Sequence, residues 1–557
     1  MFDLKITGGT VIDGTGQPGY VGDVAVKDGK IAALGAVASA AATTIDARGR
    51  AVTPGFIDLH THYDAQIAWD PSLAISPWHG ITTVLMGNCG FSVAPTRPEH
   101  RDLVLRTLER VEGMSLAALR AGVGLDFPLH DFAAYLDAIE QRGALINIAA
   151  SVGHTAVRLN AMGEDAVRRR ATADEVAAMA RLVRTARDAG AYGFTTSLSL
   201  GQFAYDGHPI PSRLADFDEI DALAGAFRDG GPGLMQASIG KLEYLERFND
   251  LAGRRDLTFT WTGILGGLTG PGSHRKYLAD AHATQARGLR VFPQFSPLPL
   301  EFEFDFDVPL PFERRPYLAA TKALDRTGKI AAYRDPALRR AFKADAPDGI
   351  DASLAGWIER TTIVSVPHAS EFNERPLAQV AAEQGVDPID LALDLAADSD
   401  LKAKFRLAIL NFVDAEVGEI LKDPCGVVAF SDAGAHASQL CNAHYSTHIL
   451  QHWVRETGTL ALEQAVYMLT GRPADVAGFK DRGRLAVGLA ADIVVFDPAT
   501  IAATPLKRVY DLPAGGDRIV CEASGIEAVI VNGTLVRRGG KDLPIPGRYP
   551  GRVLRNA

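Results

Sequence analysis

Alternating apolar and polar residues mark both ends of the chain. Residues 2–8 alternate as a strand does, and residues 526–540 show the same pattern around an Asn-Gly pair that is typical of a hairpin turn. Either end alone would leave an apolar face in water. We therefore expect the two ends to pair into one small β-sandwich, built from residues 1–54 and 485–557.

A different pattern fills residues 55–484, where short apolar runs alternate with helical segments. In residues 173–190 the apolar positions recur every three or four residues, and Gly190 provides a stop. Near-continuous apolar strands separated by helical crossovers predict a parallel (β/α)8 TIM-like barrel, with an open doubly wound sheet as the alternative. The eight predicted strands lie within 55–62, 80–89, 144–151, 191–199, 233–239, 257–265, 288–295 and 425–432.

The last two of these strands are separated by much more than one crossover needs. A segment rich in Pro, Phe and acidic residues follows the seventh strand, so we expect an insertion at about 297–350. Its alternating Phe302, Phe304 and Phe306 predict an edge strand, and the lining of a substrate pocket is the alternative. Because loops after barrel strands emerge at the catalytic face, the insertion is expected to form a flap over the barrel mouth.

The composition is typical of a globular protein and gives no sign of a nucleic-acid-binding or membrane-spanning class. The chain has 557 residues, 47% of them hydrophobic and 22% charged, as in soluble globular proteins. The net charge of -10, with no basic cluster, gives no reason to expect nucleic acid as a partner. Four scattered cysteines without a CxxC pair, no signal-peptide pattern and no long apolar run predict a cytoplasmic protein without a membrane span. A small-molecule substrate is expected, and assembly into a homo-oligomer stays open.

Candidate metal ligands stand at the ends of three predicted strands. His60 and His62 end the first strand, and their i, i+2 spacing points both imidazoles to one side, where they could chelate one divalent ion. Asp432 ends the last strand, which neighbours the first in a closed barrel. Its carboxylate could bind the metal and take a proton from bound water, or cap a following helix. Cys89 ends the second strand, where a thiolate ligand and a small buried residue are the two interpretations.

Six segments spread over most of the chain match a known pattern: GGTVIDGTG, TPGFIDLHTHYD, GNCG, ALINIAASVGH, SDAGAHAS and VGLAADIVVFDP. With them the chain resembles the amidohydrolase superfamily and, within it, the N-acyl-D-amino-acid deacylase (D-aminoacylase) family. The resemblance implies the barrel, the split sandwich, zinc, and hydrolysis of an N-acyl amide. It also implies that His60, His62, Cys89 and Asp432 are metal-site positions, with Asp432 as the general base.

The sequence departs from this family at two strands. The family normally supplies two more histidines from strands five and six, but here Ser238 and either Thr262 or Gly263 stand near those places. The fourth strand, within 191–199, also lacks a lysine that could be carboxylated to bridge two metals. One zinc ion is therefore favoured over two.

Three further residues are candidates for substrate binding. His154 follows the third strand and is expected to point into the mouth or to make a structural hydrogen bond. Arg158 lies four residues later and could meet a substrate carboxylate, although a solvated helix start is the alternative. His368 could line a pocket.

The prediction for function is a zinc amidohydrolase that cleaves N-acyl amino acids. The metal would polarise the carbonyl and activate water, and Asp432 would carry the proton to the leaving amine. A hydrolase of another amide, a cyclic imide or an ester is the first alternative. A catalytically silent binding protein on the same fold is the second.

Overall fold

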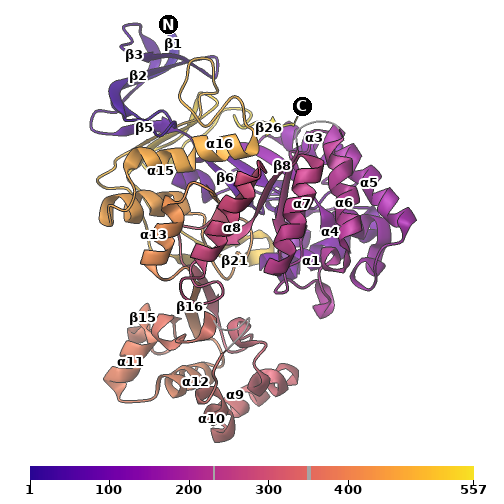
Figure 1. Cartoon of the computed structure of the whole chain (residues 1–557). Helices are drawn as coiled ribbons and strands as arrows, with labels where there is room; N and C mark the ends of the chain where they lie inside the picture. Colours follow the sequence, from indigo (N-terminus) through magenta and orange to yellow (C-terminus); the bar gives the residue numbers. More distant parts are fainter. Residues whose placement is uncertain (230–232, 348–352, 557) are drawn as a thin grey trace. The chain divides into compact units, whose positions relative to one another are not determined.

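The computed structural model describes residues 1–229, 233–347 and 353–556 (Figure 1). The chain forms two compact units. We call the larger one the barrel unit; it comprises Met1–Ile264, Leu278–Pro297 and Leu421–Ala557. The smaller one, the inserted unit, comprises Leu265–Tyr277 and Leu298–Ile420.

The two chain ends share one sheet in the barrel unit. They meet where β5 (Ala51–Pro54) pairs antiparallel with β18 (Ile493–Phe496), with Val52 opposite Val495. The pairing is stable because the apolar face of each end packs against the other, as the alternating pattern predicts. The other strands of this sheet are β1 (Phe2–Val11), β2 (Tyr20–Lys27), β3 (Lys30–Gly35), β4 (Ala41–Asp46), β23 (Ile526–Val531), β24 (Thr534–Arg538) and β25 (Lys541–Asp542).

A curled parallel sheet forms the centre of the barrel unit, and each of the eight predicted strands is present in it. The strand order is β17-β12-β11-β10-β9-β8-β7-β6. The first and last strands meet where the Asp432 amide donates to the His60 carbonyl at 3.2 Å and Thr61 bridges Ala433. This confirms the TIM-like barrel. The strands are β6 (Phe56–Thr61), β7 (Ile81–Met86), β8 (Asn147–Gly153), β9 (Gly193–Ser197), β10 (Leu234–Ser238), β11 (Thr258–Ile264), β12 (Val291–Phe295) and β17 (Val427–Val428).

The helices begin and end where the sequence provides signals. At α5 (Ala173–Asp188), Thr172 and Glu175 form a capping box. Among the described residues no helix is both long and apolar enough to cross a membrane. Outside the inserted unit's core the helices are α1 (Arg101–Glu112), α2 (Leu116–Val123), α3 (Phe132–Arg142), α4 (His154–Met162), α6 (Phe217–Arg228), α7 (Leu245–Arg255), α8 (His274–Ala286), α13 (Asp414–Lys422), α14 (Tyr445–His448), α15 (Leu462–Leu469) and α16 (Gly471–Ala477). Short strands complete this part: β19 (Ala502–Ala503), β20 (Lys507–Leu512), β21 (Gly516–Val520), β22 (Ala523–Ser524) and β26 (Val553–Leu554).

The inserted unit is larger than the sequence predicts. The expected insertion at about 297–350 lies within it, but the unit continues to Ile420, and residues 348–350 lie outside the described ranges. Its antiparallel sheet has the order β13-β16-β14-β15, so β13 is an edge strand. The elements are β13 (Leu300–Phe304), β14 (Thr361–Ser365), β15 (Arg375–Pro376), β16 (Lys404–Leu410), α9 (Arg326–Arg334), α10 (Pro336–Lys343), α11 (Leu377–Gln384) and α12 (Pro388–Asp398).

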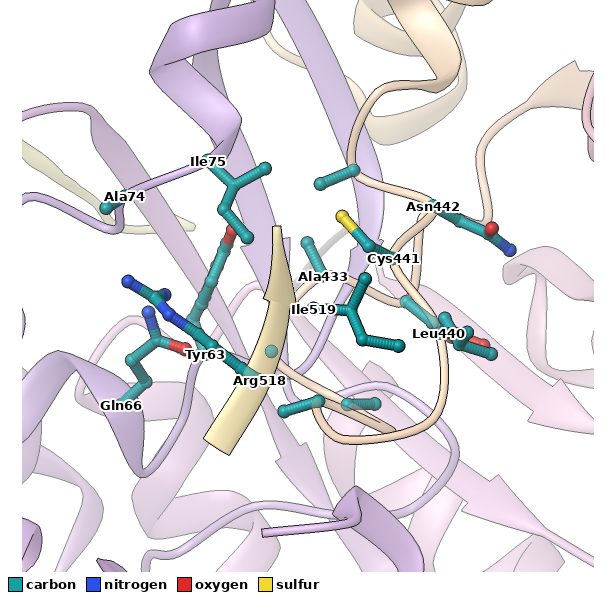
Figure 2. Close-up of a pocket in the computed structure, with 15 residues that line it drawn as sticks. Tyr63, Gln66, Ala74, Ile75, Ala433, Leu440, Cys441, Asn442, Arg518 and Ile519 are labelled. Carbon is teal, nitrogen blue, oxygen red and sulfur yellow. The ribbon is translucent and has the colours of Figure 1, made fainter. Parts of the chain in front are cut away.

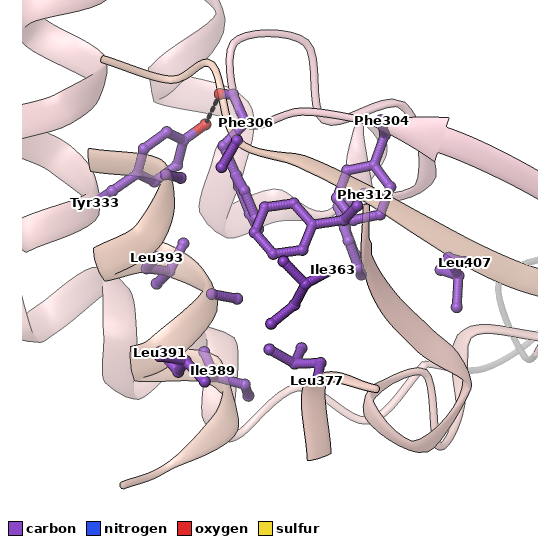
Figure 3. Packing of buried hydrophobic residues seen from close by; sticks show 14 of the residues in the cluster. Phe304, Phe306, Phe312, Tyr333, Ile363, Leu377, Ile389, Leu391, Leu393 and Leu407 are labelled. Carbon is purple, nitrogen blue, oxygen red and sulfur yellow. Dashed lines mark hydrogen bonds between the residues drawn. The ribbon is translucent and has the colours of Figure 1, made fainter. Parts of the chain in front are cut away.

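The aromatic residues of the inserted unit form its own core (Figure 3). Phe304 and Phe306 are 3% and 0% exposed, and the Tyr333 hydroxyl donates to the Phe306 carbonyl at 2.7 Å. The edge position of β13 confirms the predicted strand for Phe302 and Phe304, whereas Phe306 lies beyond its end. The pocket-lining alternative is wrong for Phe304 and Phe306 because both side chains are buried. The apolar surface of Phe304 and Phe306 is buried without a ligand, because the unit is large enough to enclose it. The flap over the barrel mouth stays a prediction.

Candidate metal centre

Three predicted ligands come together at the carboxyl ends of the first two barrel strands. His60 lies in β6, His62 follows it, and Cys89 follows β7, and all three are buried. One ligand atom from each lies within 4.8 Å of the others, and Cys89 Sγ is 3.2 Å from His60 Nε2. Period-two alternation on β6 places both imidazoles on the same side, as the sequence predicts.

Asp432 reaches this group from the far end of the sheet. Its Oδ1 lies 3.1 Å from His60 Nε2 and 3.5 Å from His62 Nε2. Closure of the barrel brings it there, because the chain after β17 pairs with β6. The next helix, α14, has His444 as its N-cap residue, so Asp432 does not cap it. The carboxylate therefore faces the two imidazoles.

A further contact at Nδ1 of each ring favours the orientation in which both imidazoles face the Asp432 carboxylate. His60 Nδ1 lies 2.6 Å from Gln294 Oε1, and His62 Nδ1 lies 3.3 Å from Glu112 Oε1. Each Nε2 therefore faces Asp432, while on the opposite side His60 Nδ1 is hydrogen-bonded to Gln294 and His62 Nδ1 has an ionic contact with Glu112. This is how outer residues orient histidine ligands of metals.

Mutual charge shifts the pKa values of the group. Burial alone would lower the pKa of His60, but Cys89 and Asp432 outweigh burial and raise it to about 10. Burial would raise the pKa of the Cys89 thiol, yet His60 and His62 lower it to about 6. The same imidazoles outweigh burial at Asp432 and hold its pKa far below the usual range. Without metal the imidazoles balance the thiolate and the carboxylate as cations. A zinc ion would take the place of the imidazole protons, and the set of nitrogen, sulfur and oxygen donors fits it.

The places of the two missing histidines are occupied by hydroxyl groups. The Ser238 hydroxyl, at the end of β10, donates to Cys89 Sγ at 3.1 Å, and the Thr262 hydroxyl donates to Ser238 Oγ at 3.0 Å. Gln236, two residues before Ser238, accepts a hydrogen bond from the Cys89 amide at 2.7 Å. These groups position Cys89 and offer no nitrogen ligand to a second ion.

Sequence reasoning missed Glu112, Gln236 and Gln294. The two glutamines carried a usable signal, because each is a polar residue near the end of an otherwise buried barrel strand. Glu112 gave none, since it ends helix α1 and only the folded chain brings it to His62.

The candidate substrate-binding residues are not part of the group around Asp432. His154 and Arg158 on α4 have no exposed surface, and both contact the Glu219 carboxylate, with His154 Nε2 at 2.8 Å. This is the structural hydrogen bond that the sequence left open for His154, and the solvated alternative for Arg158 is wrong because its side chain is buried. His368 belongs to the inserted unit. A substrate role for these residues stays a prediction.

A small cavity of about 30 Å³ adjoins Asp432. In Figure 2, Tyr63, Gln66 and Arg518 lie on one side of it, and Leu440, Cys441 and Asn442 on the other. The charged members of its lining are Asp432 and Arg518. Arg518 comes from β21, and its guanidinium is held by the Asp511 carboxylate through two bonds of 2.8 Å.

Comparison with known proteins agrees with this geometry. Residues 43–537 match the family described as "Amidohydrolase family". An N-acyl-D-glutamate deacylase of Alcaligenes xylosoxydans xylosoxydans is 33% identical over 563 residues, covering 99% of this chain and 96% of that relative. A D-aminoacylase of the same organism is 30% identical over 559 residues, covering 99% and 97%.

A solved structure extends the comparison to three dimensions. The N-acyl-D-glutamate deacylase from Bordetella bronchiseptica, complexed with zinc and a phosphonate inhibitor that mimics the tetrahedral intermediate, is 29% identical, with a TM-score of 0.69 and full coverage of both chains. The match spans barrel, insertion and terminal strands together. This chain belongs to the amidohydrolase family and, like the N-acyl-D-amino-acid deacylases it resembles, is a metal-dependent hydrolase of carbon–nitrogen bonds other than peptide bonds.

Proposed function

We propose that this protein hydrolyses the amide bond of N-acyl amino acids, with one zinc ion held at the barrel mouth by His60, His62, Cys89 and Asp432. The observation that carries the proposal is the convergence of both Nε2 atoms on one Asp432 oxygen, with Cys89 Sγ beside them. The named activities of the similar deacylases support the substrate class.

A zinc ion held by His60, His62, Cys89 and Asp432 would polarise the substrate carbonyl and make water acidic enough to attack near neutral pH. Asp432 would act as the general base, because its carboxylate lies against both imidazoles at the centre of the site, where it can accept a proton from the attacking water. It then delivers that proton to the leaving nitrogen. A hydrogen bond to Gln294 orients His60, and the nearby Glu112 carboxylate faces His62 Nδ1, so that each Nε2 faces the reacting centre.

We assign recognition of the substrate carboxylate to Arg518. An N-acyl amino acid carries a carboxylate close to its scissile amide, and Arg518 shares the cavity beside Asp432. A bidentate bond to Asp511 fixes the guanidinium in orientation. The named activities of the similar deacylases favour N-acyl amino acids over cyclic imides and esters.

A substrate panel tests the proposal. Zinc-loaded protein is assayed with N-acetyl-D-amino acids, their L-enantiomers, cyclic imides and simple esters, and His60→Ala serves as the inactive control. Hydrolysis of at least one N-acyl amino acid, lost in the control, is expected. Preference for an imide or ester would replace the substrate class, and zinc-loaded protein that cleaves nothing would support the silent binding protein.

A further inference from the structure

A second group of metal-ligating side chains lies at the opposite end of the last barrel strand. Asp432 follows β17, whereas Asp423 and Cys425 precede it, and His282 on α8 faces them. One ligand atom from each of these three lies within 4.8 Å of the others. We propose that His282, Asp423 and Cys425 form a second zinc site, separate from the catalytic one and independent of the proposed function.

The donor atoms of the three side chains lie close together. His282 Nε2 is 2.9 Å from Asp423 Oδ2, and the Cys425 amide donates to Asp423 Oδ1 at 2.9 Å. The second bond fixes the carboxylate while leaving Oδ2 toward the imidazole. Nitrogen, oxygen and sulfur donors at this spacing form the mixed set that zinc accepts, with a fourth position for water.

The exposed fraction decreases from His282 through Asp423 to Cys425. The His282 side chain is 49% exposed and that of Asp423 is 17% exposed, while Cys425 is 1% exposed. An ion can therefore enter from the His282 side and meet the thiol at the buried end. This arrangement differs from an ordinary surface ion pair, in which neither partner stands over a buried sulfur.

The loop that carries two of the ligands is held rigidly. Arg472 donates to the carbonyls of Pro424 at 2.7 Å and Gly426 at 3.0 Å, and Gln285 donates to the carbonyl of Cys425 at 2.6 Å. Three successive carbonyls are thus fixed by side chains. Gln285 lies one helical turn after His282 on α8, so the same helix supplies a ligand and anchors the loop. Little ordering entropy remains to be lost when an ion binds.

An incoming ion would displace the thiol proton of Cys425 and the contact between His282 and Asp423. Burial and the nearby Asp423 carboxylate raise the pKa of Cys425, against a smaller opposing effect of Arg472. Zinc binds cysteine as the thiolate, so the ion would displace the thiol proton of Cys425 on binding. Metal would also replace the contact between His282 and Asp423, satisfying the carboxylate and the thiolate together.

Zinc content and zinc affinity of single variants test the proposal. Zinc per chain is measured by elemental analysis after gel filtration, and affinity by competition with a chelator. His282→Ala should hold one zinc fewer per chain than the unaltered protein, or bind that ion at least about tenfold more weakly, since even residues that only support a ligand have effects of this size. His130→Ala is the matched control, because His130 is also exposed and lies 3.1 Å from Asp131; it should behave as the unaltered protein does.

Two further variants separate this site from the catalytic one. His60→Ala should lose a different ion, so the double variant His60→Ala/His282→Ala should lose both. After cobalt substitution, the thiolate-to-cobalt absorption should persist in Cys89→Ser and disappear in Asp423→Asn combined with Cys89→Ser. Equal zinc content and affinity in His282→Ala and the unaltered protein would overturn the proposal, and so would complete loss of zinc in His60→Ala.

Discussion

The mouth of the barrel and the core of the inserted unit are equally buried but differ in what they bury. At the mouth, His60, His62 and Asp432 are ionisable groups in contact with one another. In the inserted unit, the buried cluster around Phe304 and Phe306 is apolar and aromatic. Burial of ionisable groups destabilises the folded state, whereas burial of apolar groups stabilises it.

Stability and chemistry are therefore divided between the two regions, with stability in the inserted core and chemistry at the mouth. The apolar cluster stabilises its unit and offers no reactive group, while the mouth holds groups whose strong pKa shifts are typical of functional sites. Substitutions should therefore have opposite signatures: lost activity with little lost stability at the mouth, and the reverse in the inserted core.

The largest effect is expected for His60→Ala. Removal of one imidazole should abolish zinc binding at the mouth and reduce kcat/KM on the order of a thousandfold or more, because a catalytic metal contributes several kcal/mol to the transition state. The metal-free variant should unfold at nearly the same temperature as the metal-free unaltered protein. Steady-state kinetics, metal analysis and thermal unfolding measure these three quantities. A large loss of stability with zinc retained would contradict the separation of chemistry from stability.

Phe306→Ala should show the reverse signature. Truncating a fully buried phenylalanine should lower the free energy of unfolding by about 3–5 kcal/mol. Denaturant unfolding measures the loss, and Val308→Ala, at a position 49% exposed, is the matched control with little expected change. Zinc at the mouth should be retained. If Phe306→Ala leaves stability unchanged and removes zinc, the two regions are not separated as described.

Asp432→Asn sharpens the assignment of the base. The amide keeps the size of the side chain but cannot accept the proton, so kcat should fall on the order of 10² or more. Protein with zinc confirmed by elemental analysis is assayed under single-turnover conditions. Near-normal turnover would place the base elsewhere.

Arg518→Met tests recognition of the substrate. Loss of a charge-assisted contact worth about 1.5–3 kcal/mol should raise KM by roughly 10- to 100-fold and leave kcat largely unchanged. A substrate analogue with its carboxylate converted to an amide should not distinguish the variant from the unaltered protein. An equal KM for the charged substrate in both proteins would remove Arg518 from the substrate site.

The smallest effect is expected for Gln294→Met. Loss of the oxygen that holds His60 Nδ1 should weaken zinc at the mouth by about 10- to 100-fold, with the fold intact. Chelator competition measures the affinity. Gln379→Met, at an exposed position of the inserted unit, is the matched control. Unchanged affinity in Gln294→Met would mean that packing alone orients His60.

Much of the barrel could be predicted because its signal is local. Strands such as β7 and β8 are buried along their whole length, so most of their residues are apolar or small and each appears as a near-continuous apolar run. The grouping of His60, His62 and Asp432 followed from two simple rules, the alternation of side chains and the closure of the barrel.

The extent of the inserted unit had no such signal. Its sheet pairs β13 with β16, so Phe304 lies opposite Phe405, far along the chain. No local pattern joins segments so distant, and the prediction stopped at about residue 350. Glu112 was missed for the same physical reason, because its approach to His62 exists only after helix α1 packs on the barrel.

The pairing of β5 with β18 has a consequence for synthesis on the ribosome. β5 emerges early, but its partner β18 begins only at Ile493, more than 400 residues later. At roughly 5–20 residues per second, that interval lasts about 20–90 s. Throughout it the nascent chain carries a strand with one unpaired edge, the kind of edge on which chains associate wrongly. The sheet that contains β5 therefore cannot complete its pairing until β18 has been synthesised.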